Sequence, residues 1–297
     1  MRQSSLSAAA ILGLTGVHHV RAHSHVTNIV VNGASYDGFN TKEDTNPDIL
    51  AAWSTDVGPE DGWVGLEDYQ SPDIICHVNG TNAKGYVTVE AGDRISFQWL
   101  GWPESHHGPA LTYLAYCGDA SDSCVEVDKR ELEFFKIGRG GLLNATEKAT
   151  DFSSGMGIWA TDELIAKNHT WMIEVPKVLS PGFYVMRHEL IALHYAMEPT
   201  LGPQHYPQCF NIEVRGTGTQ RPDGIPATEL YTWGHPGLEY DIFVETLAPY
   251  TIPGPTLVTG AVGMPEQTSS TIESHVSAEP AEPTRMIRRP RQSRSNV

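Results

Sequence analysis

The chain has 297 residues, of which 40% are hydrophobic and 19% are charged, and its formal net charge at pH 7 is −16. That length is sufficient for one large domain, or two small ones, with a buried core. Nucleic acids and anionic membranes repel so acidic a protein, so the charge argues against both as partners and fits a neutral substrate.

Residues 1–22 predict a secretory signal peptide. Arg2 supplies the positive start, residues 6–14 form the apolar centre, and Val20 and Ala22 occupy the positions that precede a cleavage point. The apolar run is too short to span a bilayer as a helix. We therefore expect a secreted, extracellular monomer whose mature chain begins at His23.

The first half of the mature sequence predicts strands separated by loops. Residues 25–31 are rich in β-branched side chains and are followed by an Asn-Gly turn. Residues 37–75 are dense in Asp, Pro, Gly and Trp without a sustained period, which predicts a long, ordered surface loop. Residues 86–90 and 94–99 both alternate and are separated by a short Gly-containing turn, which predicts a hairpin.

The second half continues this pattern. Residues 134–138 are a short apolar patch before a Gly-rich turn, and residues 161–167 predict a short helix with Thr161 as its N-cap. Further strands are expected over residues 111–116, 170–175, 182–188 with a continuation to 195, 209–214 and 241–245. Many short strands between Gly and Pro turns predict an all-β fold, an immunoglobulin- or fibronectin-like antiparallel β-sandwich with long loops and short helices.

The composition changes from residue 259 onward. Pro, Ser, Thr and Glu dominate there, five Arg cluster between residues 285 and 294, and no periodic apolar pattern is present. Such a segment cannot bury enough apolar surface to fold by itself. We therefore expect a signal peptide over residues 1–22, one domain over residues 23–258 and a disordered tail over residues 259–297.

Four cysteines in a secreted chain imply two disulfides, for which three connectivities exist. Cys117 and Cys124 are near enough in sequence to close a small loop, which would leave Cys76 to pair with Cys209 across the chain. Three acceptor sequons for N-glycosylation begin at Asn79, Asn144 and Asn168.

The histidines are the candidates for metal chemistry, and a chain that begins at His23 has an unusual one. Its free α-amine and a ring nitrogen would both be donors, and an α-amine with a pKa of about 7.7–8.0 loses its proton to a metal readily near neutral pH. His106 and His107 lie on a turn after a predicted strand, where a scaffold can present side chains. Three nitrogens from two histidines suit copper(II). Without further observations, His23 is more simply explained as the residue that removal of the signal peptide leaves at the N-terminus.

Several stretches, taken together and in this order, resemble the fungal lytic polysaccharide monooxygenases of auxiliary-activity family nine, formerly glycoside hydrolase family sixty-one. The resemblance covers residues 23–258, nearly the whole mature domain. It rests on His23 after a signal peptide, Asp73-Ile-Ile-Cys-His77, Ser105-His-His-Gly-Pro109, Arg187-His-Glu-Leu-Ile-Ala-Leu-His194, Gln204-His-Tyr-Pro-Gln-Cys209 and Ile252-Pro-Gly-Pro-Thr-Leu257.

The resemblance implies one copper ion per chain. His23 matches the N-terminal ligand through its amine and ring, and His106 matches the second histidine, because the family pattern is His, any residue, Gly, Pro. His107 occupies the free position of that pattern and is not expected to be a ligand. Tyr206 matches the axial tyrosine.

The same resemblance implies catalytic roles for His194 and Gln204, which match the pair that hydrogen-bonds an oxygen species beside the copper. The pairs Cys76–Cys209 and Cys117–Cys124 match the disulfides of the family. The chain departs from the family at Pro203, where Ala is usual, and the segment from His194 to Gln204 is rich in proline. This departure puts the position of His194 in question.

For the reaction, the resemblance implies oxidative cleavage of glycosidic bonds in cellulose or a related β-1,4-glucan. The implied co-substrate is dioxygen or hydrogen peroxide, and the electrons come from a donor such as ascorbate, phenols or cellobiose dehydrogenase. Aromatic rings stack on sugar faces, and Tyr36 and Tyr240 are the candidates for that contact.

Two other classes of function are compatible with parts of the sequence. A non-catalytic copper- or carbohydrate-binding sandwich protein could keep the N-terminal histidine, but Gln204 and Tyr206 argue against it. A glycoside hydrolase needs two carboxylates that face one bond, and acidic residues such as Glu104 are too abundant here to indicate a pair. A zinc hydrolase usually recruits a carboxylate or a third histidine.

Overall fold

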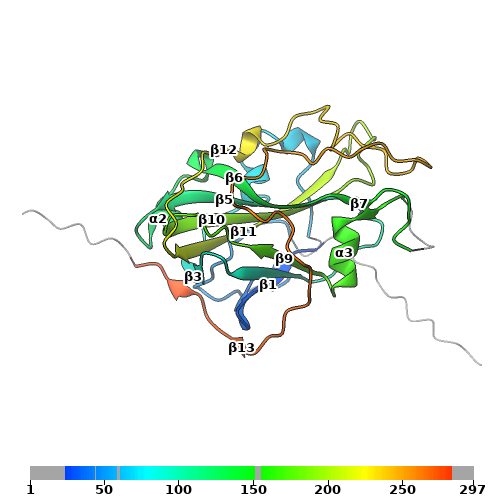
Figure 1. Cartoon of the computed structure of the whole chain (residues 1–297). Coiled ribbons are helices and arrows are strands. Elements are labelled where there is room, and N and C mark those ends of the chain that lie inside the picture. Colours follow the sequence, from blue (N-terminus) through cyan, green and yellow to red (C-terminus); the bar gives the residue numbers. More distant parts are fainter. Residues whose placement is uncertain (1–23, 44, 59–60, 151–154, 283–297) are drawn as a thin grey trace, which may run out of the picture.

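The described part of the chain folds into a β-sandwich of two sheets (Figure 1). The structure is a computed structural model, and it describes residues 24–43, 45–58, 61–150 and 155–282. The predicted signal peptide, His23 and residues 283–297 of the predicted tail lie outside these ranges. The all-β sandwich with long loops and short helices is confirmed.

The smaller sheet has five strands in the order β13-β2-β1-β4-β9. Its members are β1 (Val26–Val31), β2 (Ala34–Asp37), β4 (Arg94–Trp99), β9 (Thr170–Glu174) and β13 (Ser274–His275). The pairs around β1, β4 and β9 are antiparallel, whereas β13 runs parallel to β2.

The larger sheet has seven strands in the order β12-β6-β5-β10-β11-β3-β14. They are β3 (Gly85–Glu90), β5 (Ala110–Gly118), β6 (Glu133–Gly140), β10 (Gly182–Ala192), β11 (Gln204–Arg215), β12 (Ile225–Pro226) and β14 (Glu279–Pro280). All of these pairs are antiparallel except β3 with β11. A third sheet pairs β7 (Leu142–Asn144) with β8 (Ile158–Trp159).

The helices within the described ranges are short. They are α1 (Asp73–Cys76), α2 (Ser123–Glu126) and α3 (Ala160–Ala166), with 3₁₀ turns η1 (Leu66–Asp68), η2 (Lys129–Glu131) and η3 (Ala227–Glu229). None of them has the length and apolar character that crossing a bilayer requires.

The larger sheet separates two cores. On its inner face, side chains such as Tyr206 and Phe210 pack against the smaller sheet. On its outer face, side chains such as Val185 and Ile191 are covered by loops and short helices rather than by another sheet. We call these two sides the inner face and the outer face throughout. Because side chains alternate along a strand, neighbouring residues of β10 and β11 belong to different cores.

The predicted hairpin over residues 86–99 is wrong, because β3 and β4 lie in different sheets. At the corner between them, Ala91 N–H donates to Arg215 O of the larger sheet, and Gly92 N–H donates to Val175 O, directly after β9 of the smaller sheet. Gly92 has a φ of +105°, a conformation that glycine adopts without strain. Alternation is the same whether two strands pair or face one another, so the pattern alone could not distinguish these cases.

Two local predictions are also corrected. Trp159, not Thr161, precedes the first turn of α3, and the side chain of Asp162 accepts the Trp159 N–H at 2.7 Å. Residues 241–245 are not a strand, because Asp241 Oδ1 accepts the N–H of Phe243 in a tight turn. The apolar side chain of Ile242 is nevertheless fully buried, which explains the misleading pattern.

The predicted disorder of the tail is wrong for residues 259–282. This segment runs along the outside of the sandwich, orange to red in Figure 1. It adds β13 beside β2 and β14 beside β3, and Gln267 is buried and exchanges hydrogen bonds with both backbone groups of Met172. The segment is ordered by edge strands of the sandwich, which its own composition does not reveal.

Both predicted disulfides are present. Cys76–Cys209 joins α1 to β11, and Cys117–Cys124 joins the end of β5 to α2. The first bridge spans 133 residues of sequence, so it restricts the unfolded chain more than the second, which spans seven. It also fixes the strand that carries Tyr206.

Candidate metal centre

His106 lies on a tight turn that follows β4. Its N–H donates to Pro103 O at 3.0 Å, and its carbonyl oxygen accepts from Trp102 Nε1 at 2.8 Å. Its ring nitrogen Nδ1 lies 3.1 Å from Ser105 Oγ. Backbone and ring are therefore both fixed, as a metal ligand requires.

The same turn is fastened to the end of β10. Leu193 N–H donates to His107 O at 2.8 Å, and a Cβ on Gly108 would lie 1.9 Å from Ile191 O, so only glycine fits there. The next residue of this strand end is His194, whose ring centroid lies 4.1 Å from that of His106. The proline-rich loop that follows has thus not displaced His194 from the predicted site.

Gln204 and Tyr206 approach from the start of β11. They are two residues apart on one face of the strand, and Tyr206 O–H donates to Gln204 Oε1 at 2.9 Å. Trp102 packs edge-on against both Tyr206 and His106, with centroid distances of 5.0 and 5.7 Å. The rings of His106 and Tyr206 are 6.5 Å apart. The sequence-predicted residues His106, His194, Gln204 and Tyr206 therefore come together.

The phenol of Tyr206 is held in its neutral form. Burial, and then the negative charge of Asp61, raise the pKa of Tyr206 well above its usual value. A neutral phenol that donates its proton to Gln204 presents its oxygen as a weak neutral donor. Such an oxygen would suit a weakly bound ligand of copper.

Ser24 is the first described residue, and it lies beside the strand that leads into the His106 turn. Gly101 N–H donates to Ser24 Oγ at 3.3 Å, and Leu100 N–H donates to His25 O at 3.0 Å. His23 is the next residue toward the N-terminus and is outside the described residues. Its proposed role as a ligand remains a prediction.

Asp61, which the sequence analysis did not identify, binds the segment that begins at Ser24. His25 Nδ1 donates to Asp61 Oδ1 at 2.9 Å, and Thr41 and Lys42 also donate to this carboxylate. Burial opposes ionisation of Asp61, but the hydrogen bonds from His25, Lys42 and Thr41 outweigh it and lower the pKa of Asp61. The ionised carboxylate thereby anchors the segment two residues after His23.

The donor set of this region fits a borderline metal such as copper(II) better than a hard cation. His106 supplies an imidazole and Tyr206 a neutral phenol, and an N-terminal His23 would add an amine and a second imidazole. The described residues contain no group of three His, Cys, Asp or Glu side chains arranged for a metal ion. His23, which lies outside these residues, is predicted to complete the site.

The two tyrosines predicted to contact substrate differ in how far they are covered, and their role stays a prediction. Tyr36 is half-buried on β2 and packs against the inner core. Tyr240 is 8% exposed, contacts Trp159 and Tyr250 edge-on, and donates its O–H to Ala248 O. An exposed aromatic ring beside the site belongs to Tyr195, which is 42% exposed with its ring 4.4 Å from that of His194. Its position after a predicted site histidine was the only signal in the sequence.

The three predicted glycosylation sequons all lie where a glycan could be accommodated. Asn79 and Asn168 are exposed, and Asn144 is half-buried. At the latter, Thr146 Oγ1 donates to Asn144 Oδ1 at 2.9 Å, within the sequon itself. Their modification stays a prediction.

The sequence also missed Trp102 and the pair His107–Asp162. Trp102 stood out only as a tryptophan just before the turn. His107 Nδ1 lies 2.9 and 3.0 Å from the carboxylate oxygens of Asp162, and these residues are 55 apart in sequence. No local pattern links them.

Comparisons with known proteins agree with this geometry. Residues 23–250 match the family described as Auxiliary Activity family 9 (formerly GH61). AA9 family lytic polysaccharide monooxygenase D of Podospora anserina is 44% identical over 274 residues, covering 91% of this chain and 76% of that protein. AA9 family lytic polysaccharide monooxygenase cel61A of Hypocrea jecorina is 43% identical over 278 residues, covering 93% and 76%. The solved extended catalytic domain of H. jecorina LPMO9A is 44% identical, with a TM-score of 0.78 over 87% of this chain and 100% of that one.

Proposed function

Because the chain belongs to auxiliary activity family 9, a family of lytic polysaccharide monooxygenases, we propose that it binds one copper ion and cleaves cellulose or a related β-1,4-glucan oxidatively. The observation that carries this proposal is the convergence of His106, His194, Gln204 and Tyr206 at one end of the inner face. Secretion with cleavage after Ala22 is part of the proposal, and the family match begins at the next residue.

We propose His23 and His106 as the nitrogen ligands of the copper. His23 would bind through its α-amine and ring, and His106 through its ring nitrogen Nε2, since Nδ1 lies beside Ser105 Oγ. Tyr206 would offer its neutral phenol oxygen to the same ion. Support comes from Ser24, whose contact with Gly101 holds the chain one residue away from His23.

The bound copper would supply one-electron redox chemistry and activation of the oxygen co-substrate. Tyr206 is kept protonated by burial and by its bond to Gln204, so it adds no charge to the site. The Gln204 amide, whose Oε1 accepts from Tyr206, would donate through Nε2 to the co-substrate, and His194 would donate from its ring. Trp102 holds the rings of His106 and Tyr206 in place.

The overall reaction inserts one oxygen atom into a C–H bond next to the glycosidic oxygen. With dioxygen, two electrons and two protons from a donor such as ascorbate, a phenol or cellobiose dehydrogenase reduce the second oxygen atom to water. With hydrogen peroxide, the second oxygen atom leaves as water without further electrons. The hydroxylated carbon then eliminates the neighbouring sugar and breaks the chain.

The copper site can be tested through its N-terminus. We expect Edman sequencing of the secreted protein to begin at His23 and calorimetric titration to find one high-affinity copper site. A matched chain with one extra alanine before His23 should lose high-affinity binding, because the α-nitrogen of His23 then becomes part of a peptide bond. Equal binding by both chains would contradict the proposed ligands.

The reaction can be tested on cellulose with and without ascorbate. We expect soluble oxidised oligosaccharides only when both copper and reductant are present. Products that form without reductant and in the presence of a chelator would indicate a hydrolase instead. Copper binding without any oxidised product would indicate a non-catalytic binding protein.

A further inference from the structure

His107, the residue beside the proposed ligand His106, is tied in two directions. Its carbonyl oxygen accepts the N–H of Leu193 at 2.8 Å, directly before His194. Its fully buried ring lies 2.9 Å through Nδ1 from the carboxylate of Asp162 in α3. His107 thus connects the turn of His106, the strand end of His194 and a helix.

The first turn of α3 also forms hydrogen bonds with Gly108, the residue after His107. Gly108 N–H donates to Thr161 Oγ1 at 2.9 Å, while the hydroxyl and the N–H of Thr161 both donate to Gly108 O at 3.3 Å. Asp162 in turn accepts the N–H of Trp159 at 2.7 Å, so its carboxylate is fixed within the helix. We call the contacts of Thr161 and Asp162 with residues 107 and 108 the α3 clasp.

We propose that the α3 clasp is a positioning device for the copper site, with His107 and Asp162 setting the orientation of His106. The proposal rests on the proposed function, since it concerns the same copper. Neither His107 nor Asp162 is assigned as a ligand. They act one residue away, through the backbone that carries the ligand ring.

The chemistry of the pair favours orientation over stability as its role. In the unfolded chain both groups of such a pair form hydrogen bonds with water, so the bond between them contributes little net stability. What an apolar side chain cannot do is fix direction, and the bond to Asp162 fixes the rotation of His107. Groups that orient the ligands of a metal typically change its affinity 10- to 100-fold when they are removed.

Two substitutions of one residue separate these roles. In His107→Leu the ring is replaced by an apolar side chain without a donor. In His107→Asn the amide nitrogen takes the place of Nδ1 and can still donate to Asp162. As a control, Tyr184→Phe removes a partly buried hydrogen bond to Ser180 O near the opposite end of β10. Eight strand residues, about 26 Å, separate it from Ala192 at the site end.

All variants should be prepared as the mature chain and measured three ways: thermal unfolding without metal, copper affinity by titration, and the copper(II) EPR spectrum. We expect His107→Leu to weaken copper binding about tenfold and to shift the EPR parameters. His107→Asn should bind within about twofold of the natural protein with its spectrum. Tyr184→Phe should lower the unfolding temperature and leave the spectrum unchanged.

The outcomes separate the clasp from the proposed function. If the natural mature chain gives no copper site, the proposed function fails and the clasp falls with it. If the natural chain binds copper and His107→Leu binds with the same affinity and spectrum, the clasp alone is overturned, even where that variant unfolds earlier. A shift in His107→Leu that His107→Asn does not restore would also overturn it.

Discussion

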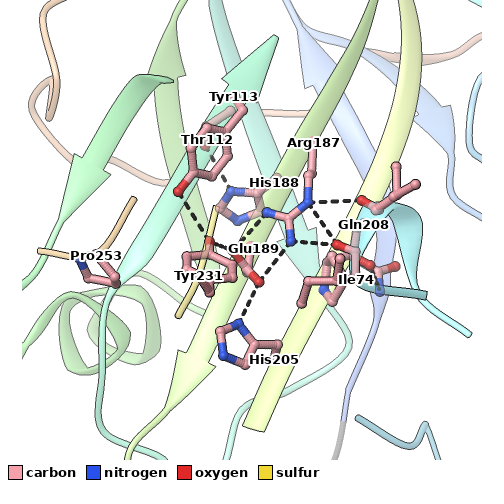
Figure 2. A network of polar contacts seen from close by, with 12 residues as sticks. Ile74, Thr112, Tyr113, Arg187, His188, Glu189, His205, Gln208, Tyr231 and Pro253 are labelled. Carbon is pink, nitrogen blue, oxygen red and sulfur yellow. Dashed lines mark hydrogen bonds and ion pairs between the residues drawn. The ribbon is translucent and has the colours of Figure 1, made fainter. Parts of the chain in front are cut away.

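The two faces of β10 and β11 carry buried polar side chains of opposite kinds. On the outer face, Arg187 and Glu189 form a buried ion pair, and His205 is hydrogen-bonded to the same carboxylate (Figure 2). On the inner face, Gln204 and Tyr206 form one neutral hydrogen bond beside the proposed metal site. His205 lies directly between these two residues in sequence, yet it points to the other side of the sheet.

The outer network satisfies its charges internally. Arg187 donates to both oxygens of Glu189 at 2.7 and 2.9 Å and to the carbonyl oxygens of Ile74 and Ile75. His205 bridges Glu189 and Tyr69 at 2.8 and 2.9 Å. Burial would raise the pKa of Glu189, but Arg187 and His205 lower it far below its usual range. Such a network fixes the scaffold, whereas the inner face leaves chemistry to a bound ion.

The largest effect should follow from breaking the outer network. Glu189→Gln leaves the guanidinium of Arg187 buried without its carboxylate. Removing one partner of a buried pair typically costs about 3–5 kcal/mol in the free energy of unfolding. Urea unfolding at pH 7 should show that loss, and the copper(II) spectrum of the folded variant should stay unchanged.

A surface pair supplies the control for this experiment. Glu163 lies 3.5 Å from Lys167 one helical turn away, with both side chains about one-third exposed. Glu163→Gln should cost about 0.3–0.5 kcal/mol, as exposed pairs do. Equal losses for Glu189→Gln and Glu163→Gln would show that the outer network contributes no more than the surface pair.

A smaller effect concerns His188, which points to the inner face. It is fully buried, stacks on Phe97 at 4.0 Å, and lies within hydrogen-bond distance of Thr112 and Trp99. Burial lowers the pKa of His188 to about 3, against an ordinary 6.5. Its contribution to stability is therefore fully present above pH 6.5 and is lost as the pH falls toward 3.

Replacing His188 should make the free energy of unfolding depend less on pH. The free energy of unfolding falls by about 1.4 kcal/mol per pH unit for a histidine that is protonated only when unfolded. His188 should therefore lower it by about 2 kcal/mol between pH 6.5 and 5. Over that interval His188→Gln should lose about 2 kcal/mol less than the natural protein in urea unfolding. Carboxylates titrate mainly below this window, so they do not obscure the difference. Parallel pH profiles would mean that His188 is already charged in the folded protein.

The sequence predicted where several strands lie, because short runs of β-branched and aromatic residues between turns are typical of buried strands. The expected bounds match β4 and β9 closely. The sequence did not predict which strands pair, so residues 86–99 were assigned to a hairpin. The tail was missed for a related reason, since β13 and β14 exist only as partners of β2 and β3.

The site residues also fall into those that the sequence predicted and those that it missed. His106, His194, Gln204 and Tyr206 were found because they belong to motifs, and the structure brings them together. Contacts between distant segments carry no such signal. Examples are His107 with Asp162, His25 with Asp61, and the burial of Tyr240.

On the inner face we expect substitution to have a small effect on stability and a large effect on the copper spectrum. Tyr206→Phe keeps the ring and removes the hydrogen bond to Gln204, whose loss should cost about 1 kcal/mol of stability. The same change removes the proposed oxygen ligand, and we expect a clear shift in the copper(II) EPR spectrum. A stability loss as large as that of Glu189→Gln, with an unchanged spectrum, would place Tyr206 among the scaffold residues instead.

The smallest effect should come from the exposed ring at the edge of the site. Tyr195 is 42% exposed beside His194, so its face is open to a sugar ring, whereas Tyr240 is buried. Tyr195→Ala should weaken adsorption to cellulose by about 0.5–1 kcal/mol, or two- to fivefold, without altering stability. Tyr240→Phe, which keeps the ring and loses only its bond to Ala248 O, should leave adsorption unchanged. The opposite ranking in a depletion assay would return the substrate contact to Tyr240 and require the loop around it to open.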